Sequence, residues 1–327
     1  MIDFKPITLQ DKPLYESYLF DETERGCEYA FANLYMWGER QIAVVCDHMV
    51  VLSFYNNQIA YLYPVGNGDK GKVLEAIIDD AKERGIVLQM MGMCGEKRQG
   101  LEEFYPGGFV YFGCQSYDDY VYDINDLADL KGRKYHKKKN HYNRFKKNYP
   151  EYRVEPISME NIEVVREMIT EWYETKQKEA PESDFEMEKA AISKALCNYA
   201  ELEMEGLMLW VGEKIAAVTM GSCMSHNTLD VHFEKARSDI DGAYTAINTE
   251  FAKYIRNKYP DIEFLNREED LGLEGLRKAK ESYYPHHMVA KCHAMLKADV
   301  DKNSVTIMGG CGERRQEITE ENECRDS

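Results

Sequence analysis

The two halves of this chain predict the same order of strands and helices, which limits the folds open to it. In the first half the predicted elements are a strand at 4–9, two helical stretches of which one is 28–40, strands at 41–55 and 58–65, a helix at 70–85, and strands at 86–92 and 117–124. In the second half they are a strand at 152–158, helices at 159–177 and 184–203, strands at 206–214, 214–223 and 228–236, a helix at 242–259, a strand at 262–266, a helix at 272–284 and a strand at 286–296. Runs of strands crossed by helices predict an α+β fold in which helices cover mixed sheets.

The recurrence also predicts the domain organisation. A length of 327 residues suits two domains, each with its own core. We expect one domain at residues 1–130 and a second at 151–297, with a basic connecting helix at 131–150. Ser158 is expected to cap the helix that follows it. Residues 298–327 are charged and interrupted by glycine, which predicts a flexible tail.

The connecting segment has an unusual charge. Nine Lys and Arg residues lie between Lys131 and Lys147 with no acidic residue among them, although the chain has a formal net charge of -17. The rest of the chain holds 32 basic and 58 acidic residues. Because an acidic surface repels phosphates, any nucleic acid must be met at this basic segment.

As a helix, the segment has an aromatic stripe flanked by cations. The stripe consists of Tyr135, Lys138, Tyr142, Phe145 and Tyr149. The candidate nucleic-acid-binding residues are Lys137, Lys138, Lys139, Arg144 and Lys147. Cations of this kind release counterions when they neutralise phosphates, which suits a tRNA acceptor stem. The alternative is a solvated helix whose cations pair with the acidic residues around it.

The cysteines and the termini predict the cellular compartment. Nine Cys residues are scattered singly, without a C-x-x-C pair, so we expect reduced thiols and no metal site. The N-terminal residues lack the pattern of a signal peptide, and no run reaches the ~18 apolar residues that a membrane span needs. The sequence therefore predicts a cytoplasmic protein without an integral membrane segment.

The order of elements resembles the GNAT fold of acyltransferases, present here as a tandem pair. GNAT enzymes bind the pyrophosphate of acetyl-CoA through R/Q-x-x-G-x-G/A at the start of a helix. The second half has Arg237 and Gly242 at the corresponding turn, and the first half has Gly66, Gly68 and Gly71 before a helix. Both spacings depart from the motif, and plain turns that use glycine for its backbone freedom explain them equally well.

A more specific resemblance lies in residues 266–296. This stretch is similar to the G-L-x-x-F-K-x-x-F/Y-x-P ending of the phosphatidylglycerol lysyltransferase C-terminal domain family, and the related Fem aminoacyltransferases have a similar ending. The matching residues are Gly275, Leu276, Lys280, Tyr283 or Tyr284, and Pro285, while Ala279 replaces the usual Phe. The segments at 64–69, 131–147 and 241–254 also resemble that family, so the likeness runs from about residue 30 to residue 296.

The resemblance implies a particular reaction. Such a protein transfers an aminoacyl group from aminoacyl-tRNA to an amine or hydroxyl acceptor, with no metal and no cofactor beyond the donor. The acceptor could be a small molecule or a lipid headgroup. The resemblance places the donor at Gly242, Ala243 and Tyr244 and at Asn266.

Three residues are the candidate catalytic residues. By resemblance, Lys280 would stabilise charge that develops on the ester or near the terminal phosphate. Arg267 and Asp270 follow the predicted strand 262–266, where Arg267 could orient a carboxylate or phosphate and Asp270 could accept a proton. Structural alternatives are an exposed helix face for Lys280 and a helix cap for Asp270. His232 is assigned no role, because a single His on a strand is usually structural.

Two other functions remain open at this point. One is a CoA-dependent N-acetyltransferase, against which the incomplete pyrophosphate motif counts. The other is a non-catalytic GNAT-fold protein that binds RNA, a nucleotide or a protein.

Overall fold

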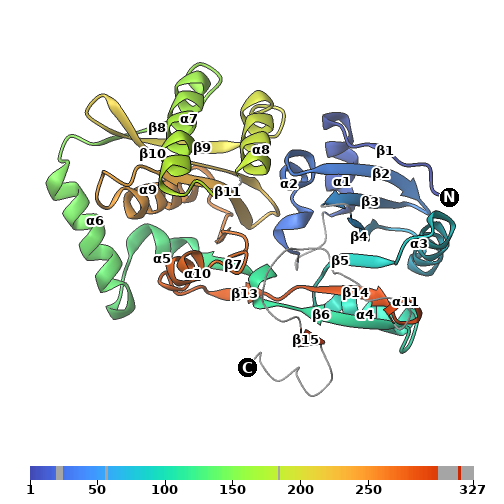
Figure 1. The fold of residues 1–327 in the computed structure, drawn as a ribbon. Helices are drawn as coiled ribbons and strands as arrows, with labels where there is room; N and C mark the ends of the chain where they lie inside the picture. The colour runs from blue at the N-terminus through green and yellow to red at the C-terminus, as the bar shows by residue number, and fades with distance from the viewer. Residues whose placement is uncertain (20–24, 56–57, 183–184, 301–315, 318–327) are drawn as a thin grey trace. The chain divides into compact units, whose positions relative to one another are not determined.

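The computed structural model describes residues 1–19, 25–55, 58–182, 185–300 and 316–317 (Figure 1). These residues form two compact units. The first unit contains residues 1–119, 269–277 and 289–327, and the second contains 120–268 and 278–288. Most of the predicted tail, at 301–315 and 318–327, lies outside the described residues, whereas α11 (Lys297–Val300) is helical.

The first unit is built on a mixed eight-stranded sheet. In spatial order its strands are β1 (Lys5–Pro6), β2 (Glu39–Val45), β3 (His48–Tyr55), β4 (Gln58–Gly66), β5 (Gln89–Met93), β14 (Cys292–Leu296), β6 (Phe109–Gly113) and β15 (Gln316–Glu317). β4 and β5 run parallel, and β14 is antiparallel to both β5 and β6. The strand that completes the centre of this sheet therefore comes from the end of the chain.

Helices cover the first sheet. They are α1 (Lys12–Tyr18), α2 (Phe31–Met36), α3 (Lys70–Arg84) and α4 (Gly95–Phe104), with single 3-10 turns at Leu9–Asp11, Cys27–Tyr29 and Gln115–Tyr117. The α3 helix begins at the side chain of Asp69, which accepts a hydrogen bond from Lys72 N, and ends at Gly85 in the left-handed conformation. Its apolar residues Val73, Leu74 and Ile77 are buried against the sheet.

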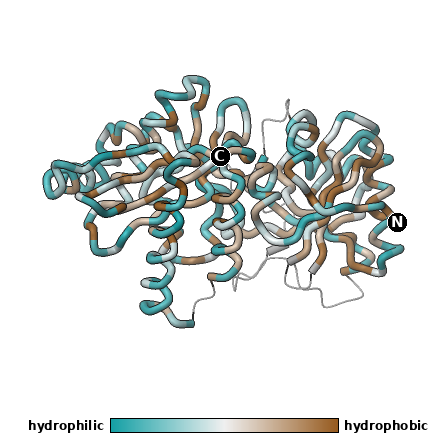
Figure 2. The backbone as a smooth tube through the Cα atoms, turned by 90° about the horizontal axis from the view of Figure 1, so that it is seen from above, coloured by the Kyte–Doolittle hydropathy of each residue, from teal (hydrophilic) through white to brown (hydrophobic). Residues whose placement is uncertain are grey.

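The second unit is built on a mixed seven-stranded sheet. Its spatial order is β13 (His287–Val289), β7 (Asp119–Asp123), β12 (Phe264–Asn266), β11 (Thr228–Ala236), β10 (Lys214–Cys223), β9 (Glu205–Val211) and β8 (Arg153–Pro156). The helices are α5 (Ile124–Asp129), α6 (His136–Asn148), α7 (Ile162–Glu179), α8 (Glu186–Cys197) and α9 (Ala243–Lys258), with a 3-10 turn at Arg133–Tyr135 before α6. The helix α10 (Glu274–Glu281) begins in residues of the first unit and ends in residues of the second. Hydrophobic and hydrophilic stretches alternate along the backbone of each unit (Figure 2).

The basic segment is part of the second unit. Tyr135, Tyr142 and Phe145 are buried in the same core as α9, which confirms the predicted aromatic stripe. The Tyr142 hydroxyl donates a hydrogen bond to Glu250 on α9, and Gly242 lies close to Phe145. The segment is thus packed along one face and exposed along the other.

The predicted fold class is confirmed, since both sheets are mixed and covered by helices. Several details differ from the sequence-based prediction. The single strand expected at 286–296 is two strands in different sheets, and α4 and α5 were not predicted. Asn161, not Ser158, is the N-cap residue of α7, and its side chain accepts a hydrogen bond from Ser158 N. The two units also interleave along the chain, whereas the sequence predicted contiguous domains.

Candidate functional site

The second sheet divides between β11 and β12. These parallel strands pair over three positions, which end with Asp230 opposite Asn266. β11 continues to Ala236, but the chain after β12 stays with β7, because Arg267 N donates to Tyr120 O and Tyr120 N donates to Glu268 O. Side chains from β11 and from residues 267–268 therefore face each other across the division.

Arg267 is the central cation of this region. Its Nη2 donates to Glu234 Oε1 at 2.9 Å, and its guanidinium lies over the rings of Tyr122 and Tyr283. Asn248 on α9 donates to the other carboxylate oxygen of Glu234 at 3.4 Å. Nη1 of Arg267 is buried and has no hydrogen-bond partner among the described residues. A buried donor without a partner in the protein can be satisfied by a bound water, ion or ligand.

Lys138 adds a second cation beside Arg267. Its Nζ lies 3.7 Å from the centre of the Tyr283 ring. Burial, together with the positive charge of Arg267, lowers the pKa of Lys138 to about 8. Lys138 was predicted to share a nucleic-acid surface with its neighbours, but its amine points to the aromatic ring while Lys137 and Lys139 are exposed.

Lys280 contacts the backbone of Arg267. Its Nζ donates to Arg267 O at 2.6 Å, and the Tyr122 hydroxyl donates to Lys280 O at 2.9 Å. The residue is 6% exposed, so the exposed-face alternative for Lys280 is wrong. The ammonium fixes the backbone that carries Arg267.

Asp270 belongs to the first unit. Its carboxylate accepts hydrogen bonds from Gly272 N, Arg277 Nε and Arg277 Nη2 at 2.8, 2.7 and 3.1 Å. The side chain is fully buried. Its carboxylate is thus committed to the turn before α10 and to Arg277, and the geometry gives no support to the predicted proton-accepting role.

The predicted donor residues lie at two places in the second unit. Gly242 has φ +84°, and Ala243, which is buried, begins α9, while Tyr244 is exposed. Asn266 is buried, and its Oδ1 accepts a hydrogen bond from Glu268 N at 2.7 Å, so its side chain holds the turn after β12. A hollow of about 300 Å³ opens between α7 and the loop that leads to Gly242. It is lined by Met168, Glu171, Trp172, Thr175, Lys176, Glu179, Arg237, Ser238 and Asp239.

The cations of the basic segment at 131–147 divide into paired and unpaired groups. Arg144 pairs with Asp241 at 2.8 Å, and Lys134 pairs with Asp126 at 3.3 Å. Lys137, Lys139 and Lys147 are exposed and form no ion pair with any described residue. The pairing alternative therefore holds for part of the segment only. No helix among the described residues has the length and apolar character needed to cross a membrane.

The sequence-based reasoning missed a hydrogen-bonded group around His232. His232 Nε2 lies 2.8 Å from Ser222 Oγ, and His232 Nδ1 lies 3.1 Å from Glu268 Oε1. The alternation of His232 with Val231 and Phe233 was the available signal. Its partners come from another strand and from the turn after β12, and no local spacing connects them.

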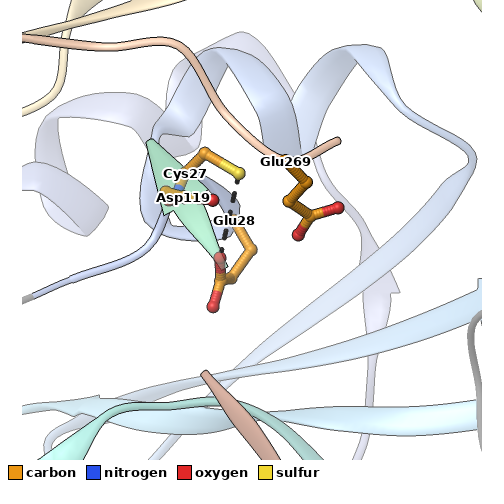
Figure 3. A group of neighbouring side chains, drawn as sticks. All are labelled: Cys27, Glu28, Asp119 and Glu269. Atoms are coloured by element: carbon orange, nitrogen blue, oxygen red, sulfur yellow. Dashed lines mark hydrogen bonds between the residues drawn. The ribbon is translucent and has the colours of Figure 1, made fainter. Parts of the chain in front are cut away.

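A second group that the sequence did not reveal lies in the first unit. Figure 3 shows Cys27, Glu28, Asp119 and Glu269, whose ligand-type atoms all lie within 4.8 Å of one another. Lys291 Nζ contacts the three carboxylates at 3.0, 2.7 and 2.6 Å in that order. The ammonium already occupies the position that a metal ion would take, so we interpret the group as a buried ion cluster.

Comparisons with known proteins show which sequence family and which solved structures the chain resembles. The chain is 40% identical to a conserved protein of unknown function from Bacteroides thetaiotaomicron, with a TM-score of 0.85 and coverage of 91% of this chain and 100% of that chain. The structure of L-PGS from Bacillus licheniformis is 16% identical with a TM-score of 0.63, covering 88% of this chain and 92% of that one. FemX is 10% identical with a TM-score of 0.57, covering 92% and 99%. These last two similarities show a shared fold.

No protein of curated function matches the chain. Residues 21–294 match the sequence family described as phosphatidylglycerol lysyltransferase, C-terminal. That match covers most of the chain and confirms the resemblance drawn from residues 266–296. The chain therefore belongs to the phosphatidylglycerol lysyltransferase C-terminal family, an acyltransferase family of GNAT type.

Proposed function

We propose that this protein transfers an aminoacyl group from aminoacyl-tRNA to an amine or hydroxyl acceptor. The observation that carries the proposal is the buried Arg267, whose Nη1 has no partner among the described residues, beside the half-buried Lys138. Two cations at the division of a sheet suit a ligand that carries negative charge or develops it during reaction. Family membership supports the choice of an acyl donor.

The reaction needs positive charge at a defined place. When a nucleophile attacks the ester carbonyl, a bond forms to the carbonyl carbon, the ester C–O bond breaks, and the proton of the nucleophile passes to the leaving ribose oxygen. Negative charge develops on the carbonyl oxygen during the attack. Arg267 Nη1–H and the Lys138 ammonium would stabilise that charge, and Lys280 would hold Arg267 in position through the hydrogen bond to Arg267 O.

Charged tRNA would approach along α6. Lys137, Lys139 and Lys147 present three unpaired cations on the exposed side of this helix. The test is tRNA affinity measured across a salt series for the wild type and for a Lys137→Glu, Lys139→Glu, Lys147→Glu variant. We expect the slope of log K against log salt to become shallower by about 2 to 3 in the variant.

A matched variant separates a local contact from a change of net charge. Lys72, Lys82 and Lys178 are exposed and lie on α3 and α7. Their triple replacement by Glu changes the net charge equally and should leave the slope unchanged. If both variants lose affinity in parallel, or if the wild type ignores tRNA, the tRNA part of the proposal fails.

The chemical step has its own test. The assay mixes the protein with small amines and with tRNA that carries a radiolabelled amino acid, and it measures release of the label from the tRNA. We expect Arg267→Met to slow this release about 100-fold while tRNA binding persists. Lys280→Ala should also slow it. A wild type that binds charged tRNA but releases nothing, with no difference in Lys280→Ala, would indicate a non-catalytic binding protein.

The hollow beside the loop at Arg237–Asp239 favours a second candidate, a CoA-dependent N-acetyltransferase. The loop before a helix is where such enzymes bind pyrophosphate, and α9 begins just after it. Within the hollow, however, Arg237 is paired with Glu171 at 3.0 Å and with Asp239 at 3.4 Å. Calorimetry with acetyl-CoA decides between the candidates, and saturable binding would favour the acetyltransferase.

A further inference from the structure

His232 is placed by an irregularity in β11. Along the β10–β11 pair, Met220 lies opposite Phe233 and the next residue, Gly221, lies opposite Val231, so His232 is the extra residue of a β-bulge. A Cβ on Gly221 would lie 2.2 Å from Asp230 O, so only glycine permits this approach of the strands. Bulges commonly redirect a side chain at a functional site. This one aims His232 at Ser222 on the neighbouring strand.

The contacts of His232 determine which ring nitrogen holds the proton. Nδ1 faces two carboxylates, Glu268 Oε1 at 3.1 Å and Asp230 Oδ2 at 3.5 Å. Carboxylates accept hydrogen bonds, so the neutral ring carries its proton on Nδ1. Nε2 is then an acceptor, and the Ser222 hydroxyl donates to it at 2.8 Å. A serine that donates to a histidine oriented by an acid is the arrangement of an activated nucleophile.

The backbone at Glu268 is strained in a way that serves this contact. Glu268 has φ +56°, a left-handed conformation that disfavours residues with a Cβ. Such conformations are unfavourable and cluster at functional sites. The hydrogen bond from Glu268 N to Asn266 Oδ1 holds the turn, which directs the carboxylate to His232. Glu268 is therefore a positioning residue.

Ser222 lies just past the point where pairing between β10 and β9 ends. The last residue of β10 that pairs with β9 is Gly221, so Ser222 pairs only with β11. Ser222 is 5% exposed, and the His232 side chain is fully buried. The Glu268 side chain is 21% exposed, so the hydrogen-bonded series is more open to solvent at Glu268 than at Ser222, and an ester donor would reach the serine hydroxyl from the end of β10.

We propose that Ser222 is a nucleophile activated by His232 and Glu268, and that it takes the acyl group of an ester donor as a transient serine ester. Ser222 Oγ bonds to the carbonyl carbon while its proton moves to His232 Nε2. The bond to the ribose oxygen breaks, and that oxygen takes the proton from Nε2. The acceptor amine then attacks the serine ester, its proton passes through His232, and Oγ leaves as the hydroxyl. The donor's identity rests on the proposed function, but the activation of Ser222 does not.

The test uses a fluorophosphonate probe, which forms a stable adduct with activated serines and requires no tRNA. Peptide mapping of the full-length protein should place the adduct on Ser222. We expect His232→Gln to slow adduct formation about 100-fold and Glu268→Gln about 10-fold, because the base and its orientation are lost. Ser225→Ala, at a nearby serine that bonds to Asn227 instead, should behave like the wild type.

Folding is checked by thermal unfolding, because His232 is buried and its variant can lose stability. Glu268→Gln keeps the shape of the side chain and reports on the same adduct, so a misfolded His232→Gln does not stop the test. Absence of an adduct on Ser222 in folded protein would overturn the inference. So would equal rates in wild type and Glu268→Gln, or one tightly bound metal ion per chain at Asp230, His232 and Glu268.

Discussion

At the scale of single residues, Lys291 is a buried cation of the first unit that depends on three carboxylates to balance its charge. It is 5% exposed on its side chain and contacts Glu28, Asp119 and Glu269 within 3.0 Å. Removing one partner from a buried ion group leaves charge without compensation, which costs about 3–5 kcal/mol. We therefore expect Lys291→Met to lower the free energy of unfolding by about that amount, as measured by urea denaturation.

The matched control for Lys291 is Lys72→Met, since the side chain of Lys72 is 70% exposed. That variant should stay within about 0.5 kcal/mol of the wild type. Adding Glu269→Gln to Lys291→Met should restore part of the loss, because one of the uncompensated charges disappears. An unchanged unfolding midpoint in Lys291→Met would show that the cluster tolerates an empty centre.

Glu269 predicts a pH effect on stability. Burial, together with the negative charges of Asp119 and Glu28, raises the pKa of Glu269 to about 7 against the lowering effect of Lys291. Its ordinary value is 4.5, so between about pH 4.5 and pH 7 the folded state holds a proton that the unfolded state has lost. Stability must then fall as pH rises through this window, by about 2–3 kcal/mol for this group.

The measurement for Glu269 is the free energy of unfolding from pH 5 to pH 8 in wild type and Glu269→Gln. The wild type minus variant difference isolates this carboxyl from the other acids. We expect the difference to decline with rising pH. A flat difference would place the pKa of Glu269 near its ordinary value.

At the scale of elements, the junction of α6 and α9 depends on Gly242. Its φ is +84°, and an added Cβ would lie 3.0 Å from Phe145 Cβ. Gly242→Ala combines backbone strain with a clash, so we expect a loss of about 2–3 kcal/mol. Gly212→Ala is the control, because Gly212 also has positive φ, at +57°, but no atom lies within 4 Å of an added Cβ. It should lose only about 1 kcal/mol.

Denaturation of both glycine variants checks this prediction. Equal losses would mean that α6 can shift away from α9 without cost. If Gly242→Ala folds normally but loses tRNA-dependent transfer, the glycine serves the donor site that the sequence predicted.

Elements were predicted from sequence where their signal is local. The spacing of Tyr135, Tyr142 and Phe145 indicated which face of α6 is buried, because helical periodicity is a property of the segment itself. The same periodicity placed Lys138 on that stripe, but it could not show that Tyr283, far along the chain, lies under its amine. Lys280 was found by motif and Arg267 by its place after a predicted strand, and their contact through a backbone carbonyl needed the structure.

The groups around His232 and Lys291 could not be predicted. Ser222, His232 and Glu268 meet because of a one-residue bulge, and a bulge leaves no pattern in a sequence of alternating residues. Lys291 and Glu28 are separated by more than two hundred residues, and each by itself looks like a surface charge. In both cases long-range pairing of strands, not local propensity, brings the side chains together.

At the scale of the whole molecule, the interleaving of the two units governs stability. β14 lies between β5 and β6 in the first sheet, although it comes from residues 292–296. It contributes Cys292 and Ala294 to the core of that unit. The sequence predicted a first domain that ends near residue 130, because each half has its own run of strands and nothing local shows that the final strand crosses to the other sheet.

Two truncations that differ by ten residues test the role of β14. A chain ending at residue 300 keeps β14 and loses only the segment after α11, whereas a chain ending at residue 290 loses β14 and leaves β5 and β6 without their shared partner. Unpaired strand edges and an opened core cannot be compensated locally, so the first unit should lose its cooperative unfolding transition in the shorter chain. Calorimetry of both chains measures this, with the longer one expected to unfold like the full-length protein. If the shorter chain also keeps every transition, the first unit folds without its borrowed strand, and the contiguous division near residue 130 describes the folding units better than the sheet order does.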